Sequence, residues 1–213
     1  MEFDRLVRLV GDLPVFESSL LLAGQAHPGQ TQLQLSRWAA AGKILRLRRG
    51  LYALAPPYQK TAPHPFVVAN HLVRASYVSA QSALAHHGLI PETVPVTVSI
   101  TGQRPSRHRT PLGRYVYHHL QAAHRRGYQR LEVSPGQWAF VAAPAKALLD
   151  LVYLTPGGDA PAYLAELRLQ NWDLLDLAEL RREAERFASP KLLRASKALA
   201  ALAEAGVSEF AAP

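Results

Sequence analysis

Apolar residues recur at helical spacing near the start of the chain. Within residues 3–10, apolar side chains fall three or four positions apart, which predicts a helix with one buried face. Residues 17–24 predict a second, shorter helix that ends at Gly24, because glycine is suited to a C-terminal cap. A Pro-Gly turn then leads into a third predicted helix.

The third predicted helix, within residues 28–42, has two unlike sides. Leu35 and Trp38 lie on a stripe that suits a hydrophobic core. The exposed side is expected to carry the amide, hydroxyl and guanidinium groups of Gln30, Thr31, Gln34 and Arg37. Groups of this kind can pair with the edges of bases in a DNA groove.

The next segment, KILRLRRGLYAL (residues 43–54), alternates apolar and basic residues with the period of a β-strand. The Arg-Gly step at residues 49–50 predicts the turn of a hairpin. Because opposed residues share a face, the predicted apolar face comprises Leu45, Leu47, Tyr52 and Leu54. In this register Leu47 lies opposite Tyr52, and Arg46 and Arg48 share the other face.

Three helices followed by a basic hairpin form the pattern of a winged helix-turn-helix. In that arrangement the third helix enters a major groove and the hairpin, or wing, contacts phosphates. The alternative is a plain edge hairpin whose charges only keep the surface soluble.

A proline-rich stretch, APPYQKTAPHP (residues 55–65), predicts an extended linker, because proline interrupts helices. We therefore expect a winged helix-turn-helix domain over residues 1–57 and a second domain over residues 64–213. Residues 64–155 mix predicted helices with short strands of an antiparallel-rich sheet, and three amphipathic helices follow. The predicted fold class is α+β: a winged helix-turn-helix, then a mixed α/β domain with a helical C-terminal tail.

The distribution of charge supports a polyanionic partner. The 213-residue chain has a net charge of +8. Residues 61–130 carry 8 Lys and Arg against 1 Asp or Glu, whereas residues 131–213 carry 8 against 11. The basic excess therefore lies upstream of residue 131 and predicts a nucleic-acid-facing part, because neutralised phosphates release counterions. Ordinary solvated faces are the alternative for the last segment.

The segment GQRPSRHRTPLGR (residues 102–114) places Arg104, Arg107, Arg109 and Arg114 in a predicted Gly- and Pro-bounded loop between two strands. Such a loop could touch the DNA backbone, meet an acidic protein surface, or simply be solvated.

Cysteine is absent, which suits a reducing cytoplasm, and no stretch approaches the roughly 18 apolar residues of a membrane span. We therefore expect a cytoplasmic protein without membrane contact.

Catalytic and metal sites are not apparent in the sequence. Eight of the nine histidines lie between residues 64 and 124, but their adjacent pairs diverge on a strand or a helix and offer no chelating signature. Carboxylates in the second domain are scattered, and no nucleophile motif or phosphate-binding loop occurs. We expect no enzymatic activity, no cofactor and no metal.

Lys146 and Asp150 lie four residues apart on a predicted helix, the spacing of an intrahelical ion pair. A structural role is the first interpretation, and a role in binding a protein partner is the second.

The motifs LSRWAAAGKILRLRRGLYAL, YVSAQSALAHHGLIPE, VTVSITGQRPSRHRTPLGRYVYHHL and FVAAPAKALLDLVYL occur in this order over about residues 15 to 155. In order and spacing they resemble AbiEi-type antitoxins of type IV toxin-antitoxin systems. The resemblance implies a transcriptional autoregulator that neutralises an AbiEii-type nucleotidyltransferase toxin. The alternative is a stand-alone winged-helix regulator without a toxin.

The predicted partners are double-stranded DNA, at an inverted repeat in the promoter, and the toxin; the chain could also form a homo-oligomer on DNA. The predicted DNA-binding residues are Gln30, Thr31, Gln34, Arg37, Lys43, Arg46, Arg48, Arg49, Arg104, Arg107, Arg109 and Arg114.

Overall fold

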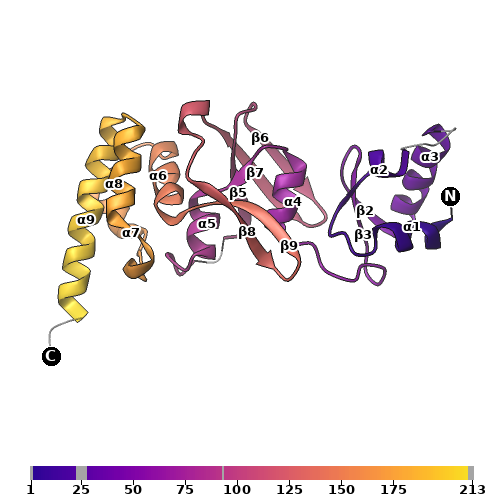
Figure 1. The fold of residues 1–213 in the computed structure, drawn as a ribbon, viewed down its shortest axis with the longest axis horizontal. Helices are drawn as coiled ribbons and strands as arrows, with labels where there is room; N and C mark the ends of the chain where they lie inside the picture. The colour runs from indigo at the N-terminus through magenta and orange to yellow at the C-terminus, as the bar shows by residue number, and fades with distance from the viewer. Residues whose placement is uncertain (1, 23–27, 93, 211–213) are drawn as a thin grey trace.

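The structure is a computed structural model that describes residues 2–22, 28–92 and 94–210. Its fold is α+β. A small N-terminal part of helices and strands is followed by a second part, a six-stranded mixed sheet with helices, and then by a helical tail (Figure 1). The three parts follow one another along the longest axis of the molecule.

The elements of the N-terminal part are α1 (Phe3–Val10), β1 (Phe16–Glu17), α2 (Ser18–Leu22), α3 (Pro28–Ala40), β2 (Ile44–Arg48) and β3 (Leu51–Leu54). The three strands form an antiparallel sheet in the order β1-β3-β2. The helices and the hairpin are confirmed, but β1 was not predicted. Two residues are too few to show a strand period, and β1 exists through its pairing with β3. Gly24, the predicted cap of the second helix, lies outside the described residues.

The register of the β2–β3 hairpin differs from the predicted one because Leu47 forms a β-bulge. Arg46 lies opposite Tyr52. Beyond the bulge, Arg48 lies opposite Leu51. Because opposed residues share a face and faces alternate along a strand, Arg46 and Arg48 lie on opposite faces. The prediction that both arginines share one face is therefore wrong.

Both faces of the hairpin are largely buried, which the prediction of a single apolar face did not anticipate. One face packs against the N-terminal helices through Ile44, Tyr52 and Leu54, in a cluster that also contains Leu6, Leu35 and Trp38. The other face packs against the second part through Leu45, Leu47, Leu51 and Ala53. The residues of the predicted apolar face are thus divided between two hydrophobic clusters: Leu45 and Leu47 belong to one, and Tyr52 and Leu54 to the other.

Residues 55–64, which connect the two parts, are held from both sides. The ring of Tyr58 packs edge-on against Phe3, with ring centroids 4.8 Å apart. The side-chain amide of Gln137 donates to the main-chain oxygen of Ala62 and accepts from the main-chain nitrogen of His64. The division into domains at residues 57–64 stays a prediction.

The second part contains α4 (Pro65–Leu72), β4 (Tyr77–Val78), α5 (Ala80–His86), β5 (Val96–Thr101), β6 (Ser106–Thr110), β7 (Gly113–His119), β8 (Tyr128–Ser134), β9 (Gln137–Ala142) and α6 (Pro144–Leu154). The strand order is β6-β7-β5-β4-β9-β8, with β6 and β8 at the two edges. The neighbours β5–β7 and β4–β9 are parallel, and the other neighbouring strands are antiparallel.

Strand β6 corrects the prediction that residues 102–114 form a loop. Its sequence, SRHRT, contains no apolar residue, so it has no hydrophobic period that could have indicated a strand. Pairing with β7 makes it a strand, and the basic side chains therefore lie on an ordered sheet edge.

The tail comprises α7 (Pro161–Glu166), α8 (Leu177–Arg186) and α9 (Pro190–Phe210), as predicted. Leu180, Ala184, Leu192 and Leu199 bury one side of these helices against the same cluster as Leu148 of α6. Within the described part of the chain, no helix has the length and apolar character needed to cross a membrane.

Candidate nucleic-acid interface

Helix α3 exposes most of its predicted base-reading side chains. Gln30 and Arg37 are exposed and Gln34 is half-buried. Thr31 is only 4% exposed, so the prediction that it lies on the exposed side is wrong. Thr31 precedes Leu35 by four residues and thus lies on the same helical stripe as this core residue.

Three further predicted residues lie before β2, within it and at the tip of the hairpin: Lys43, Arg46 and Arg49. Arg46 and Arg49 are exposed. Between β2 and β3, Gly50 has a backbone φ of +80°, which glycine adopts without strain, and its oxygen accepts from the main-chain nitrogen of Ser18. Lys43 is half-buried, with its ammonium group 4.7 Å from the centroid of the Phe3 ring. Arg46 and Arg49 are therefore the accessible cations of the hairpin.

Arg48 is directed to the contact between the N-terminal part and the second part. Its guanidinium donates to the main-chain oxygen of His71 at 3.2 Å and lies 3.8 Å from the Glu17 carboxylate. Glu17 also forms an ion pair with Arg74. The hydrogen bond from Arg74 holds the pKa of the Glu17 carboxyl below its ordinary value. Arg48 thus links the N-terminal part to the second part, a role that the sequence did not reveal. Contrary to the sequence prediction, it does not lie on the same face as Arg46.

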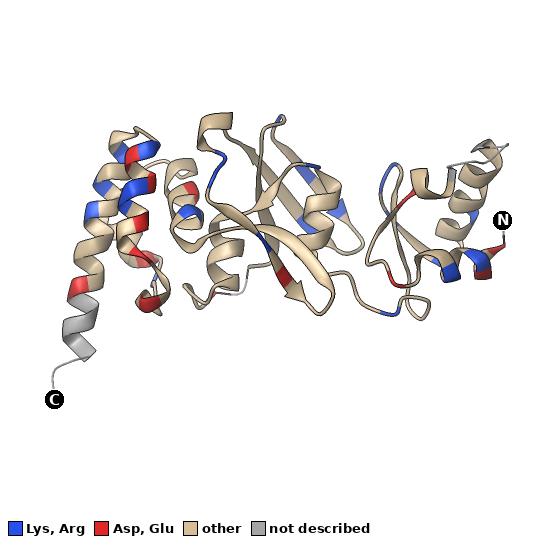
Figure 2. Ribbon diagram, viewed as in Figure 1, with Lys and Arg blue, Asp and Glu red and all other residues tan. Residues whose placement is uncertain are grey.

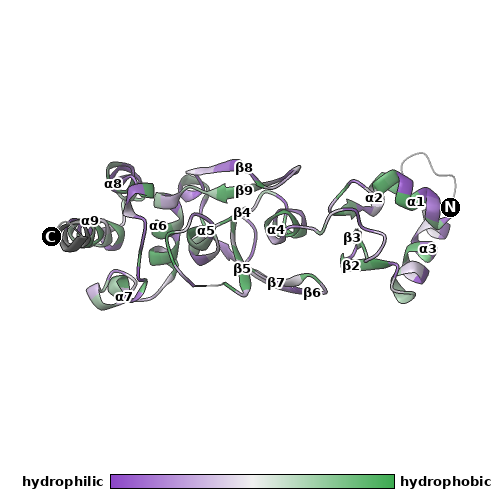
Figure 3. Cartoon of the chain, turned by 90° about the horizontal axis from the view of Figure 1, so that it is seen from below, coloured by the Kyte–Doolittle hydropathy of each residue, from purple (hydrophilic) through white to green (hydrophobic). Residues whose placement is uncertain are grey.

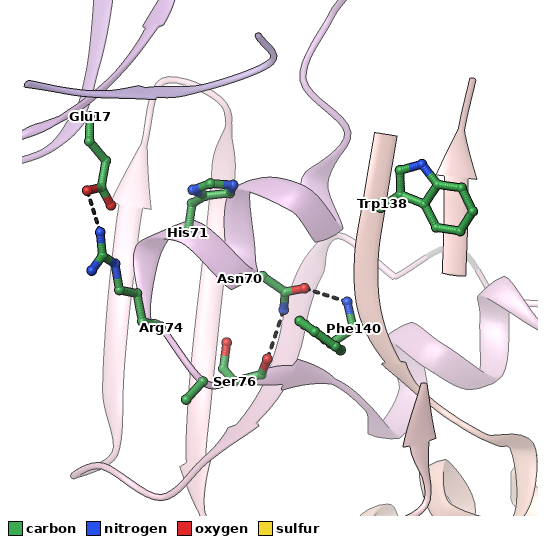
Figure 4. Close-up of a pocket in the computed structure, with 8 residues that line it drawn as sticks. Glu17, Asn70, His71, Arg74, Ser76, Trp138 and Phe140 are labelled. Carbon is green, nitrogen blue, oxygen red and sulfur yellow. Dashed lines mark hydrogen bonds and ion pairs between the residues drawn. The ribbon is translucent and has the colours of Figure 1, made fainter. Parts of the chain in front are cut away.

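The contact between the two parts borders a pocket of about 320 Å³ that sequence reasoning missed (Figure 4). Glu17 and Arg74 lie on one side of it, and Trp138 and Phe140 of β9 lie on the other. Asn70 spans part of the gap, donating to the Ser76 oxygen and accepting from the main-chain nitrogen of Phe140. No spacing rule connects residues so far apart in sequence.

The β6–β7 hairpin presents a group of basic side chains on one face. Arg107 and Arg109 alternate along β6 and are exposed, and Arg109 lies directly opposite the exposed Arg114 of β7. Arg104, also exposed, precedes β6. Like charges directly opposite each other on a sheet are destabilising. A bound polyanion would relieve this repulsion.

The two basic hairpins lie on the same side of the molecule. Strand β2 contacts β6, and Figure 3 shows both hairpins along one side of the chain, with β8 and β9 along the other. Among the described residues, no ion pair involves Arg46 or Arg49, nor Arg107, Arg109 or Arg114. In the tail, by contrast, acidic and basic residues intermingle and several form ion pairs (Figure 2).

Two histidines of the β6–β7 hairpin, His108 and His118, are shifted toward their neutral form. Burial lowers the pKa of His108, and the nearby Arg48 guanidinium lowers it further. Burial, and then Arg107, lowers the pKa of His118 in the same way. Near neutral pH the positive charge of this surface therefore comes from arginine. In the described ranges, the structure contains no group of three or more residues arranged to hold a metal ion.

Lys146 and Asp150 form the predicted intrahelical ion pair of α6, and it is buried: the side chains are 1% and 0% exposed. Asp150 also accepts from the hydroxyls of Ser79 at 2.7 Å and Tyr77 at 3.2 Å. The ammonium group of Lys146 lies 4.5 Å from the centroid of the Phe187 ring. Neither charged group reaches the surface, so a direct contact with a protein partner does not fit this geometry.

No protein-family model matches the chain, and no curated protein sequence matches it significantly. Among solved structures, the chain is similar to the crystal structure of the RV2827C protein from Mycobacterium tuberculosis, with a TM-score of 0.52 and 15% sequence identity. The similarity covers 91% of this chain and 76% of that chain. At this identity it shows a shared fold alone.

Proposed function

We propose that this protein is a DNA-binding transcription regulator whose N-terminal part acts as a winged helix-turn-helix. The observation that carries the proposal is a set of exposed arginines that form no ion pair among the described residues: Arg46 and Arg49 of the β2–β3 hairpin, and Arg107, Arg109 and Arg114 of the β6–β7 hairpin, whose strand β6 contacts β2. Cations with no acidic neighbour to neutralise them suit the phosphates of a duplex, because each phosphate contact releases counterions.

The arrangement of the N-terminal elements supports this use. A short strand after the first helix pairs with the hairpin that follows the third helix. The hairpin packs against α3, because Ile44, Tyr52 and Leu54 share a cluster with Leu35 and Trp38. On α3, Gln30, Gln34 and Arg37 retain exposed or half-buried side chains that can read base edges in a major groove. On this proposal the hairpin tip contacts the flanking DNA backbone.

The β6–β7 hairpin is proposed as a second phosphate contact. Opposed Arg109 and Arg114 repel each other in the free protein, and this repulsion is offset when a phosphate lies between or above them. Since β2 contacts β6, one duplex can reach both hairpins.

The resemblance to AbiEi antitoxins extends the proposal to autoregulation and to neutralisation of an AbiEii-type nucleotidyltransferase toxin. On this proposal the protein is a cytoplasmic, non-enzymatic regulator. A stand-alone regulator would have the same basic surface. An adjacent nucleotidyltransferase reading frame, and rescue of growth when that frame is co-expressed with the full chain, would separate the two.

The DNA-binding proposal is tested by replacing Arg46 and Arg49 together with alanine. Binding to a random duplex and to the DNA upstream of the gene is measured over a series of salt concentrations. The slope of log affinity against log salt should flatten by about 0.9 for each phosphate that the variant no longer neutralises. The two residues are exposed, so the variant should fold normally.

The matched control removes the same charge from the tail, through Arg181→Ala and Arg182→Ala. Both arginines are exposed and pair with tail carboxylates, so their removal should leave the slope unchanged. Equal slopes for the wild-type protein, the hairpin variant and the control would contradict the proposal.

A further inference from the structure

Strand β8 (Tyr128–Ser134) is an open edge of the six-stranded sheet. It pairs with β9 on one side, and in the described ranges no strand lies on its other side. Arg130 and Glu132 are exposed along it. An open edge offers unpaired main-chain groups to a further strand.

The hydrogen bonds of β9 show which main-chain groups of β8 point outward. Phe140 lies opposite Arg130, but its main-chain nitrogen donates to the Asn70 side chain at 2.6 Å, away from β8 (Figure 4). The Arg130–Phe140 pair is therefore a non-hydrogen-bonded pair of the antiparallel ladder, and the N–H and C=O of Arg130 face the open edge. By alternation, so do those of Tyr128 and Glu132.

A second β8 can pair antiparallel with this edge only if residues whose N–H and C=O groups face the open edge lie opposite residues of the same kind in the second copy. Centring the two-fold axis on Arg130 places arginine opposite arginine. Centring it on Glu132 places glutamate opposite glutamate. Centring it on Leu131 places each Arg130 opposite Glu132 of the second copy, which is favourable. The sequence of β8 is therefore self-complementary in one central register.

We propose that β8 is a self-association surface, at which β8 of a second copy of this chain pairs antiparallel about a two-fold axis at Leu131. Arg130 and Glu132 of the second copy exchange main-chain hydrogen bonds and also form a cross-strand ion pair. By symmetry, the contact occurs twice. Leu131 meets its own counterpart in the closer, non-hydrogen-bonded pairing.

The face of the sheet beside this edge supports a protein contact. Trp138 and Phe140 lie opposite Glu132 and Arg130, so they share their face, and each is 45% exposed. The Arg130 guanidinium lies 4.8 Å from the centroid of the Trp138 ring. Pairing about Leu131 brings the aromatic groups of two copies onto one continuous sheet surface.

The opposite edge of the sheet lacks this self-complementarity. Strand β6 carries Arg107 and Arg109 with His108 between them and no acidic residue, so self-pairing would oppose like charges. Because β6 and β8 are opposite edges, self-association at β8 leaves the basic hairpins free (Figure 3). The proposal does not depend on DNA binding.

The test is a charge-reversal experiment on the purified full chain without DNA. In Arg130→Glu, glutamates oppose each other across the axis, and in Glu132→Arg, arginines do. Each single variant should self-associate roughly tenfold or more weakly than the wild-type protein, because two favourable pairs become two repulsive pairs. Sedimentation equilibrium over a range of concentrations measures the association.

Two further samples restore complementarity. An equal mixture of the single variants should form heterodimers, because one edge is then wholly acidic and the other wholly basic. The double variant Arg130→Glu/Glu132→Arg should regain self-association. Arg107→Glu, which makes the same charge change on the other edge strand, is the control and should associate like the wild-type protein.

A wild-type protein that stays monomeric at all accessible concentrations would overturn the proposal. So would single variants that associate as well as the wild-type protein, or a mixture that does not recover association. Circular dichroism of each variant checks that the monomer is folded, which matters most for Glu132→Arg because the Glu132 carboxylate also accepts from the main-chain nitrogen of Gly136 at 2.7 Å.

Discussion

Replacing Lys146 with methionine should destabilise the protein in a strongly pH-dependent way. Lys146 and Asp150 are both buried, and Lys146 is the cation that compensates the Asp150 carboxylate. Methionine has a similar length and keeps an apolar chain against the Phe187 ring, so the change mainly removes the charge.

The magnitude follows from leaving a buried charge without its partner. Breaking a buried ion pair on one side destabilises a protein by about 3–5 kcal/mol. Here Ser79 and Tyr77 still donate hydrogen bonds to Asp150, so we expect a loss of about 3 kcal/mol in the free energy of unfolding at neutral pH. Since a domain is stabilised by roughly 5–15 kcal/mol in total, this loss is readily measured.

The pH dependence follows from the pKa of Asp150. Burial raises this pKa above its ordinary value, and the Lys146 ammonium group opposes the rise. Without Lys146 the folded-state pKa of Asp150 rises further. At pH values between the unfolded-state and the folded-state pKa, the folded protein therefore keeps a proton on Asp150 that the unfolded chain has released. A raised folded-state pKa contributes stability below the unfolded pKa, and this contribution is lost as pH rises through the folded value. The loss caused by Lys146→Met should therefore be small in acid and largest at neutral pH.

Urea unfolding, followed by tryptophan fluorescence over a series of pH values, measures the effect. Lys146→Met/Asp150→Leu, which removes both charges, should be more stable at neutral pH than the single variant. Arg181→Met is a control that breaks an exposed pair of the same spacing and should cost at most about 1 kcal/mol. A loss below about 1 kcal/mol for Lys146→Met, or one that does not vary with pH, would refute the reasoning.

Three further predictions concern the N-terminal part. Arg37→Ala should weaken binding to a cognate site by about 1–3 kcal/mol and to random DNA by less, and equal losses in a titration would make Arg37 a backbone contact. Thr31→Val, which keeps the shape of a buried side chain, should leave DNA affinity unchanged, and a selective loss at the cognate site would restore Thr31 as a base reader. A fragment of residues 1–61 exposes Leu47 and Leu51, so thermal unfolding and light scattering should show lower stability or self-association. A monomer as stable as the full chain would show that the N-terminal part folds independently.

Local pattern determined the helices and the position of the hairpin. Leu35 and Trp38 follow the helical period that places them in the core, and the Arg-Gly step at residues 49–50 forms the predicted turn. The ion pair of Lys146 and Asp150 was also predictable, because a helix brings residues four apart together. These features depend on neighbours within a few positions of the chain, so the sequence alone contains the information.

Tertiary structure decided which surfaces remain exposed and which polar residues from distant segments form pairs. The bulge at Leu47, and with it the turning of Arg48 toward His71, depends on a second apolar face being covered by a distant part of the chain. Strand β6 has no apolar period and exists only through pairing with β7. The burial of Lys146 depends on packing by the tail, whose Phe187 lies over its ammonium group. Such contacts join segments that are far apart in sequence, and the local periodicity of apolar residues does not indicate them.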